Sequence, residues 1–95
     1  MVWDREKIRT SLTSKGFRQR NDRDHDVLTL HVGGLRRAIW TKLSRSSGHK
    51  VYGNKLLAAM CDQLFVTRRQ LNRLIECDMK QPEYLDVLRS RQVLR

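Results

Sequence analysis

The sequence contains few cysteines and few residues that interrupt regular structure. Among its 95 residues there are two cysteines, Cys61 and Cys77, one proline and five glycines. A disulfide framework needs more cysteines, and zinc sites usually show paired Cys or His at short spacing. We therefore expect both cysteines to be reduced core residues on helices. The remaining composition is that of a globular protein, and the length suits a single domain over residues 1–95.

Long hydrophobic runs are also absent from the sequence. No segment approaches the roughly 20 apolar residues that cross a bilayer, and residues 1–5 lack the basic start and apolar stretch of a signal peptide. No segment pairs a basic face with a broad apolar face, as helices on membrane surfaces do. We therefore expect a cytoplasmic protein that has no membrane partner.

Acidic residues are missing from the middle of the chain. The formal net charge is +10, and residues 27–60 contain no Asp or Glu. The cations of this acid-free stretch are Arg36, Arg37, Lys42, Arg45, Lys50 and Lys55. A stretch of one sign concentrates positive potential and attracts polyanions. The charge distribution therefore predicts a nucleic-acid partner, with a merely solvated basic surface as the alternative.

Local signals predict the order helix, three strands and three helices. Asp4 is a good helix N-cap and Gly16 a natural helix end, which predicts a first helix over 5–15. The predicted strands cover 17–20, 27–32 and 35–43, with a turn at 21–24, and the later helices cover 55–65, 68–77 and a segment from Pro82. This order indicates the α+β class, with a three-stranded antiparallel sheet packed on helices and extra C-terminal helices.

The two glycines at 33–34 predict a tight hairpin turn. A two-residue turn would place Leu30 opposite Arg37 and Leu28 opposite Ile39. The other face of the hairpin would then carry His, Trp, Lys and Arg side chains. Arg37 fits poorly on an apolar face, so a register shift of one residue is the alternative.

Several residues of the acid-free stretch are candidates for contact with a nucleic acid. The Ser/Gly-rich segment 44–53 is predicted as a loop that leads into a helix capped by Asn54, and helix N-termini favour anions. Trp40 on a basic strand is suited to stacking on a base, with core packing as the alternative. The candidate binding residues are Arg36, Trp40, Lys42, Arg45, His49, Lys50 and Lys55.

His25 lies in an unusual acidic cluster, Asp22-Arg23-Asp24-His25-Asp26. Histidine exchanges protons near neutral pH, so His25 is a candidate general acid or base that moves a proton from a 2′-hydroxyl or to a leaving oxygen. Nearby Lys and Arg would stabilise the charge on the phosphorane. The alternative is a solvent-exposed turn histidine without a role. The acidic pattern lacks the Gly and distant Glu of a calcium loop, so we expect no metal and no cofactor.

Five short segments together resemble a known family. They are Lys15-Gly16-Phe17, Asp24-His25, Trp40-Thr41-Lys42-Leu43-Ser44, Gly48-His49-Lys50 and Gly53-Asn54-Lys55-Leu56-Leu57. In these segments the chain resembles the HicA-type small toxins and their relatives, which have a fold like that of double-stranded-RNA-binding domains. The resemblance covers roughly residues 5–65. Residues 66–95 form a C-terminal helical extension, similar to the tails of small bacterial relatives.

The resemblance implies an α-β-β-β-α core and a metal-independent mRNA interferase that a partner antitoxin neutralises. The family's catalytic histidine stands at the start of the second strand, which is the position of His25. One departure concerns the context of this histidine. The family shows Gly-Ser-His or Ser-His-His there, whereas this chain has an aspartate on each side of His25.

Three functional hypotheses follow from these observations. The first is an RNA-cleaving enzyme that uses His25 and loses activity in His25→Ala. The second is a non-catalytic nucleic-acid-binding module, whose salt-dependent binding survives His25→Ala. The third is a protein-interaction module, borne by a phage or mobile element, that turns its basic face to an acidic protein and co-purifies with it. The oligomeric state is left open by the sequence.

Overall fold

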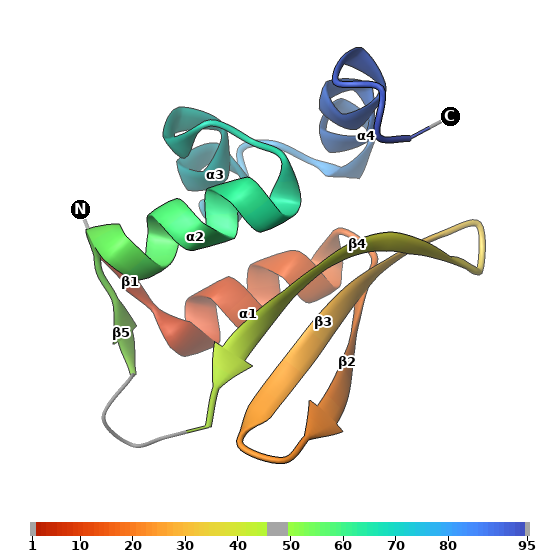
Figure 1. The fold of residues 1–95 in the computed structure, drawn as a ribbon. Coiled ribbons are helices and arrows are strands. Elements are labelled where there is room, and N and C mark those ends of the chain that lie inside the picture. The colour runs from red at the N-terminus through yellow and green to blue at the C-terminus, as the bar shows by residue number, and fades with distance from the viewer. Residues whose placement is uncertain (1, 46–49, 95) are drawn as a thin grey trace.

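A computed structural model describes residues 2–45 and 50–94, which form an α+β fold (Figure 1). Its elements are β1 (Trp3–Asp4), α1 (Arg5–Ser14), β2 (Phe17–Asp22), β3 (His25–Val32), β4 (Leu35–Ser44), β5 (Val51–Tyr52), α2 (Asn54–Leu64), α3 (Arg68–Ile75) and α4 (Gln81–Ser90). The predicted class and the three-stranded antiparallel sheet are confirmed, with strand order β2-β3-β4. Within the described ranges, no helix has the length and apolarity needed to cross a bilayer.

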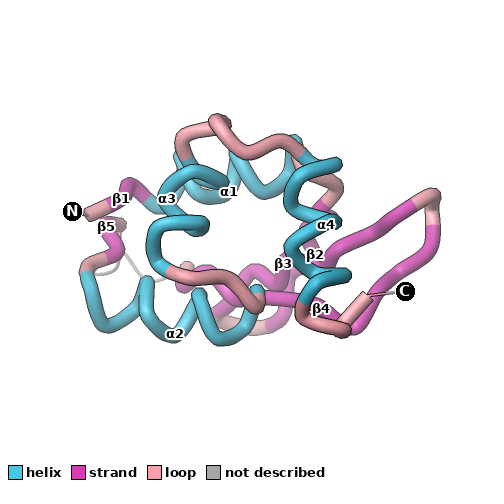
Figure 2. The backbone as a smooth tube through the Cα atoms, turned by 90° about the horizontal axis from the view of Figure 1, so that it is seen from above, coloured by secondary structure: helices cyan, strands magenta, loops and turns pink. Residues whose placement is uncertain are grey.

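The four helices lie on one side of the sheet and leave the other side uncovered (Figure 1). Seen from above, α1, α2, α3 and α4 are arranged around the core, and the tip of the β3–β4 hairpin extends beyond α4 (Figure 2). A sheet with one covered and one uncovered face shows alternating burial along its strands. In β4, for example, Ile39, Thr41 and Leu43 are buried, whereas Trp40 and Lys42 are exposed.

The predicted cap of the first helix forms, and the third helix is also capped by a side chain. The Asp4 carboxylate accepts hydrogen bonds from the Glu6 and Lys7 N–H groups at 2.8 and 3.4 Å, and α3 begins with a capping box between Thr67 and Gln70. The predicted cap of α2 is wrong. Gly53 occupies the N-cap position, Asn54 is the first helical residue, and no described side chain caps this helix.

Gly16 ends the first helix as predicted, and its position requires a glycine. Its φ is +99°, in the region that side chains rarely adopt. A Cβ atom there would lie 2.5 Å from Gln81 Nε2 and 2.8 Å from the His31 carbonyl oxygen. Gly16 therefore lets α1 turn into β2 while the chain passes close to both β3 and α4.

The turn between β2 and β3 is shorter than predicted. Asn21 and Asp22 continue β2 and pair with Asp26 and His25. Only residues 23 and 24 remain for the turn, and residue 23 has a φ of 53°. The polar composition of 21–24 is typical of a turn, but cross-strand pairing extends the strand through its first half.

The register of the β3–β4 hairpin changes along its length. His31 pairs with Arg36, as a two-residue turn requires, but Thr29 pairs with Trp40. The single residue between His31 and Thr29 therefore faces three residues of β4. The predicted Leu30–Arg37 and Leu28–Ile39 pairs are wrong, and the shift is two residues rather than the one considered. It removes Arg37 from the apolar face and keeps Ile39 in the core, where its exposure is 2%.

The segment predicted as a loop over 44–53 contains a short strand. Val51 and Tyr52 of β5 pair with Asp4 and Trp3 of β1. The Trp3 indole N–H also donates to Asn72 Oδ1 at 3.0 Å. Strands of two residues have no periodic pattern, so only the folded contacts reveal this pair.

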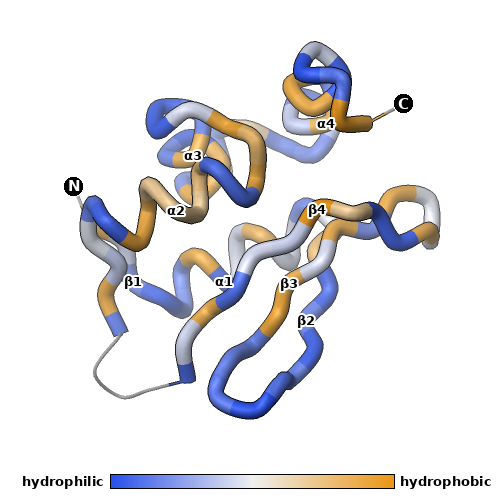
Figure 3. Tube along the Cα trace, viewed as in Figure 1, coloured by the Kyte–Doolittle hydropathy of each residue, from blue (hydrophilic) through white to orange (hydrophobic). Residues whose placement is uncertain are grey.

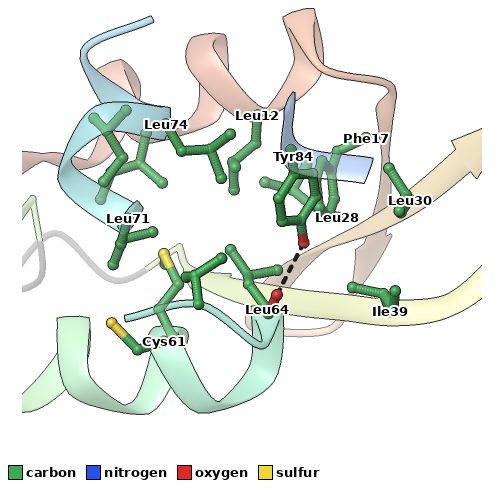
Figure 4. Packing of buried hydrophobic residues seen from close by; sticks show 14 of the residues in the cluster. Leu12, Phe17, Leu28, Leu30, Ile39, Cys61, Leu64, Leu71, Leu74 and Tyr84 are labelled. Atoms are coloured by element: carbon green, nitrogen blue, oxygen red, sulfur yellow. Dashed lines mark hydrogen bonds between the residues drawn. The ribbon is translucent and has the colours of Figure 1, made fainter. Parts of the chain in front are cut away.

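One hydrophobic core joins the first 65 residues to the C-terminal helices (Figure 4). Leu12, Leu28, Leu64 and Leu74 are fully buried in it, and the Tyr84 hydroxyl donates to the Leu64 carbonyl oxygen at 3.0 Å. The region after residue 65 therefore completes the core instead of forming a separate tail.

The two cysteines differ in their surroundings, and both are free thiols. Cys61 is buried in α2, as predicted. The prediction for Cys77 is wrong, because it follows the end of α3 with a φ of 63° and is exposed. The sequence predicts a helix as far as residue 77, but α3 ends at Ile75.

Candidate nucleic-acid interface

The uncovered side of the sheet, here called the open face, collects side chains from all three strands. Directly paired residues of an antiparallel sheet point to the same side. The register therefore places three rows on the open face: Arg18–Thr29–Trp40, Arg20–Val27–Lys42 and Asp22–His25–Ser44. His31 and Arg36 continue it toward the hairpin tip. In the hydropathy colouring, β2 and its turn to β3 are hydrophilic almost throughout (Figure 3).

Cations dominate a hollow of about 370 Å³ on the open face. Its walls include Arg20, Arg36, Arg37 and Lys42, together with one acidic residue, Asp22. A neighbouring hollow of about 200 Å³ adds Arg18, and Arg20 and Arg36 line both hollows. The open face thus carries five cations against one carboxylate.

The cations of the open face differ from those of the helical side in their pairing. In the part of the chain that the structure describes, Arg18, Arg20, Arg36, Arg37 and Lys42 form no ion pair with a carboxylate. On the helical side, several arginines are paired, and the N–O distances are 2.7 Å for Arg9–Asp26, 2.6 Å for Arg73–Glu83 and 3.2 Å for Arg89–Asp86. The positive charge of the open face is therefore left for a partner to neutralise.

Trp40 is a surface residue of this face. Its exposure is 45%, and Lys42 Nζ lies 5.8 Å from the centroid of its ring. That distance is within the range of a cation–π contact. Core packing, the alternative considered for Trp40, is therefore wrong. An exposed indole held beside an ammonium group offers a flat surface on which a base can stack.

His25 is exposed at the beginning of β3 and pairs with Asp22 on one side and Ser44 on the other. It also lines a cavity of about 240 Å³ between β4 and α2, together with Lys42. Its neighbour Asp26 points to the opposite side of the sheet and is buried. The acid that shares the face of His25 is therefore Asp22 and not the adjacent Asp26.

The structure brings together only some of the predicted binding residues. Arg36, Trp40 and Lys42 meet on the open face. Arg45 is instead engaged locally, since its Nε lies 3.7 Å from Asp26 Oδ1 and its Nη1 donates to the Arg23 carbonyl oxygen. Lys50 and Lys55 are exposed at the starts of β5 and α2, away from the open face. His49 lies outside the described residues.

Sequence reasoning missed Arg18 and Arg20 as members of the interface. Only Phe17 is apolar and buried in this strand, so its sequence shows no polar and apolar alternation that would assign the two arginines to a face. Their place follows from the pairing of β2 with β3, which sets Arg18 and Arg20 in line with Trp40 and Lys42.

The described residues include no group of three or more His, Cys, Asp or Glu side chains placed to hold a metal ion. Comparisons of the chain with protein-family models, with curated proteins and with solved structures find no match. The candidate interface therefore stands on its own geometry, a basic sheet surface with one exposed tryptophan.

Proposed function

We propose that this chain binds single-stranded RNA on the open face of its sheet. The observation that carries the proposal is a set of five cations, which form no ion pair within the described residues, near an exposed indole on the side of the sheet without helices. Cations neutralise phosphates, and aromatic rings on sheets stack on unpaired bases. A duplex hides the faces of its bases, so the indole favours a single strand.

The arrangement of the elements agrees with the kind of protein that the sequence resembles. α1, β2, β3, β4 and α2 occur in the order of an α-β-β-β-α core, with the two-residue strand β5 between β4 and α2. Under this proposal, that core is related to the HicA-type and double-stranded-RNA-binding-domain-like folds. α3 and α4 are then an extension that supplies part of the hydrophobic core.

The salt dependence of RNA binding tests the proposal. The test variant replaces Arg18 and Arg36 with glutamine, and the control replaces the ion-paired Arg73 and Arg89 with glutamine, so that each variant loses two positive charges. Each phosphate contact to a single strand contributes about 0.7 to the slope of log K against log salt. We therefore expect the test variant to lower that slope by about 1.4, and the control to leave it unchanged, in anisotropy titrations of a labelled oligonucleotide.

Two results would overturn this proposal. One is equal loss of affinity in the two variants, which would mean that total charge and not the open face governs binding. The other is the absence of RNA binding by the wild type at low salt. Co-purification of an acidic protein in that second case would favour the protein-interaction hypothesis. An antitoxin, which the resemblance implies, would be such a partner.

A second candidate function is RNA cleavage by His25. The observation that favours it is the exposed position of His25 in a cavity that Lys42 also lines. In this reaction His25 takes the proton of a 2′-hydroxyl, whose oxygen attacks the adjacent phosphorus. The bond to the 5′-oxygen breaks, and that oxygen takes a proton from water. The products are a 2′,3′-cyclic phosphate and a 5′-hydroxyl, and Lys42 stabilises the charge of the phosphorane.

Expression of the wild type and of His25→Ala in bacteria separates cleavage from binding alone. Growth arrest by the wild type only, with RNA cleavage that persists in the presence of a chelator, would support the enzyme. The wild type and His25→Ala should bind RNA equally in the anisotropy titration. If neither the wild type nor His25→Ala arrests growth or cleaves RNA, although both bind RNA, the chain is a non-catalytic binding module.

A further inference from the structure

We infer that the cavity between β4 and α2 is a binding site for one nucleobase of the RNA strand. The inference rests on the proposed RNA binding and adds a base-recognition site beside the open face. The cavity has a volume of about 240 Å³. Cavities for drug-sized ligands range over roughly 300–1,000 Å³, so this one suits a single ring system rather than a whole nucleotide.

The walls of the cavity match the two kinds of surface that a base presents. One wall comes from α2 and is apolar, with Leu56, Ala59 and Met60, and Leu56 is 40% exposed. The opposite wall comes mainly from β4 and carries hydroxyl and ammonium groups. A flat heteroaromatic ring has apolar faces and a polar edge, and such a cavity receives both.

The polar wall is fixed by its own hydrogen bonds. The buried Thr41 hydroxyl donates to Gln63 Oε1, which turns the amide nitrogen of Gln63 away from Thr41. Among the described residues, that nitrogen has no hydrogen-bond partner. Nearby, the Tyr52 hydroxyl oxygen accepts from the Ser44 N–H at 2.8 Å. The wall is therefore preorganised before any ligand binds.

The groups left for a ligand are mainly donors, namely the Gln63 amide nitrogen and the Lys42 ammonium. Donors select a base edge that carries acceptors. Guanine offers two adjacent acceptors, N7 and O6, whereas the corresponding edge of adenine pairs an acceptor with an amino donor. Cytosine likewise presents adjacent O2 and N3 acceptors. The geometry thus favours cytosine, the single-ring base with two adjacent acceptors, over adenine.

The cavity is continuous with the proposed path of the strand. Lys42 lines both the cavity and the large hollow of the open face. Gln63 lines the cavity and, with Trp40, a further hollow of about 210 Å³ along the same edge of β4. A strand that stacks one base on Trp40 can therefore place a neighbouring base in the cavity, next to His25.

Two adjacent alanines of α2 provide the test. Ala59 lines the cavity, whereas Ala58 is exposed on the same helix and lines no described hollow, so Ala59→Phe fills the site and Ala58→Phe is its matched control. A second test variant, Gln63→Leu, removes the donor without filling the cavity. The probes are short oligocytidine and oligoadenosine strands with 2′-fluoro sugars, which lack the hydroxyl needed for cleavage.

We expect the wild type and Ala58→Phe to bind oligocytidine about tenfold more tightly than oligoadenosine, the effect of one or two hydrogen bonds. Ala59→Phe and Gln63→Leu should reduce this preference to about twofold or less, with thermal melting as the check that each variant is folded. Equal binding of both strands by the wild type overturns the base site but leaves RNA binding intact. A preference for oligocytidine that persists in both Ala59→Phe and Gln63→Leu also overturns the base site. No binding of either strand at low salt overturns the proposed function together with the site.

Discussion

Arg9 Nη1 of α1 lies 2.7 Å from Asp26 Oδ2 of β3, on the side of the sheet opposite His25. The Asp26 side chain is only 9% exposed, and Arg45 Nε lies 3.7 Å from its other oxygen. Although Asp26 follows His25 directly in the sequence, strand alternation sends the two side chains to opposite faces. Asp26 therefore holds α1 against the sheet and leaves His25 to the open face.

Replacing Asp26 with asparagine should destabilise the fold without changing RNA binding. Breaking a fully buried ion pair costs about 3–5 kcal/mol. Because Arg9 is partly exposed and also contacts Glu6, we expect a loss of about 2 kcal/mol in urea denaturation. The control is Asp86→Asn, which breaks an exposed pair with Arg89 and should cost less than about 1 kcal/mol. Equal effects of the two substitutions would contradict a structural role for Asp26.

Trp40 should contribute to RNA affinity and little to stability. Removing an aromatic ring that stacks on a base costs about 1–3 kcal/mol, so Trp40→Ala should weaken binding by about tenfold or more. Trp40→Phe, which keeps an aromatic face, should lose less. Val51→Ala, at another exposed apolar residue, is the control and should bind normally. A large fall in the melting temperature of Trp40→Ala would instead show that the indole supports the fold.

Local sequence signals predict the elements of this fold well. The Asp4 cap, the glycine at position 16 and the glycine pair at 33–34 each act within a few residues, and the structure places each as its local chemistry requires. The order of helices and strands follows from these signals. The α+β class then follows from the order.

Features that depend on distant partners are not available from the sequence. The β1–β5 pair joins Trp3 to Tyr52, and neither segment is long enough to show a period. The two-residue shift in the hairpin depends on the cost of burying Arg37 against the gain of burying Ile39, which local rules do not weigh. The sequence predicts only part of the open face. Trp40 lies within the acid-free stretch and is predicted as a binding residue, whereas Arg18 lies outside that stretch and joins the face only through strand pairing.

Tyr84 connects the C-terminal helices to α2, and Tyr84→Phe should measure that connection. The substitution leaves the buried Leu64 carbonyl oxygen without its donor, which costs about 1–2 kcal/mol. For a chain of this size, each kcal/mol lowers the melting temperature by about 4–8 °C. Calorimetry should therefore show a single transition at lower temperature. Two separate transitions in the wild type would contradict a shared core.

The same tyrosine should also give the protein a specific sensitivity to alkali. Burial raises the pKa of Tyr84 well above its ordinary value. Above about pH 10 the unfolded chain loses the tyrosine proton while the folded chain keeps it, so the stability that Tyr84 contributes is fully present below that pH and falls as the pH rises further. Tyr84→Phe should lack this component. Parallel pH curves for the two proteins in denaturant titrations would argue against it.

The two thiols should react at different rates with an alkylating agent. A hydrogen bond with Ser11 and the nearby Lys15 ammonium lower the pKa of the exposed Cys77, whereas burial raises the pKa of Cys61. Since the thiolate is the nucleophile, iodoacetamide at neutral pH should modify Cys77 first, as followed by peptide mass spectrometry. Ser11→Ala should slow the reaction of Cys77 and leave Cys61 unchanged. Equal rates at both thiols in the folded protein would show that neither exposure nor the Ser11 contact controls their reactivity.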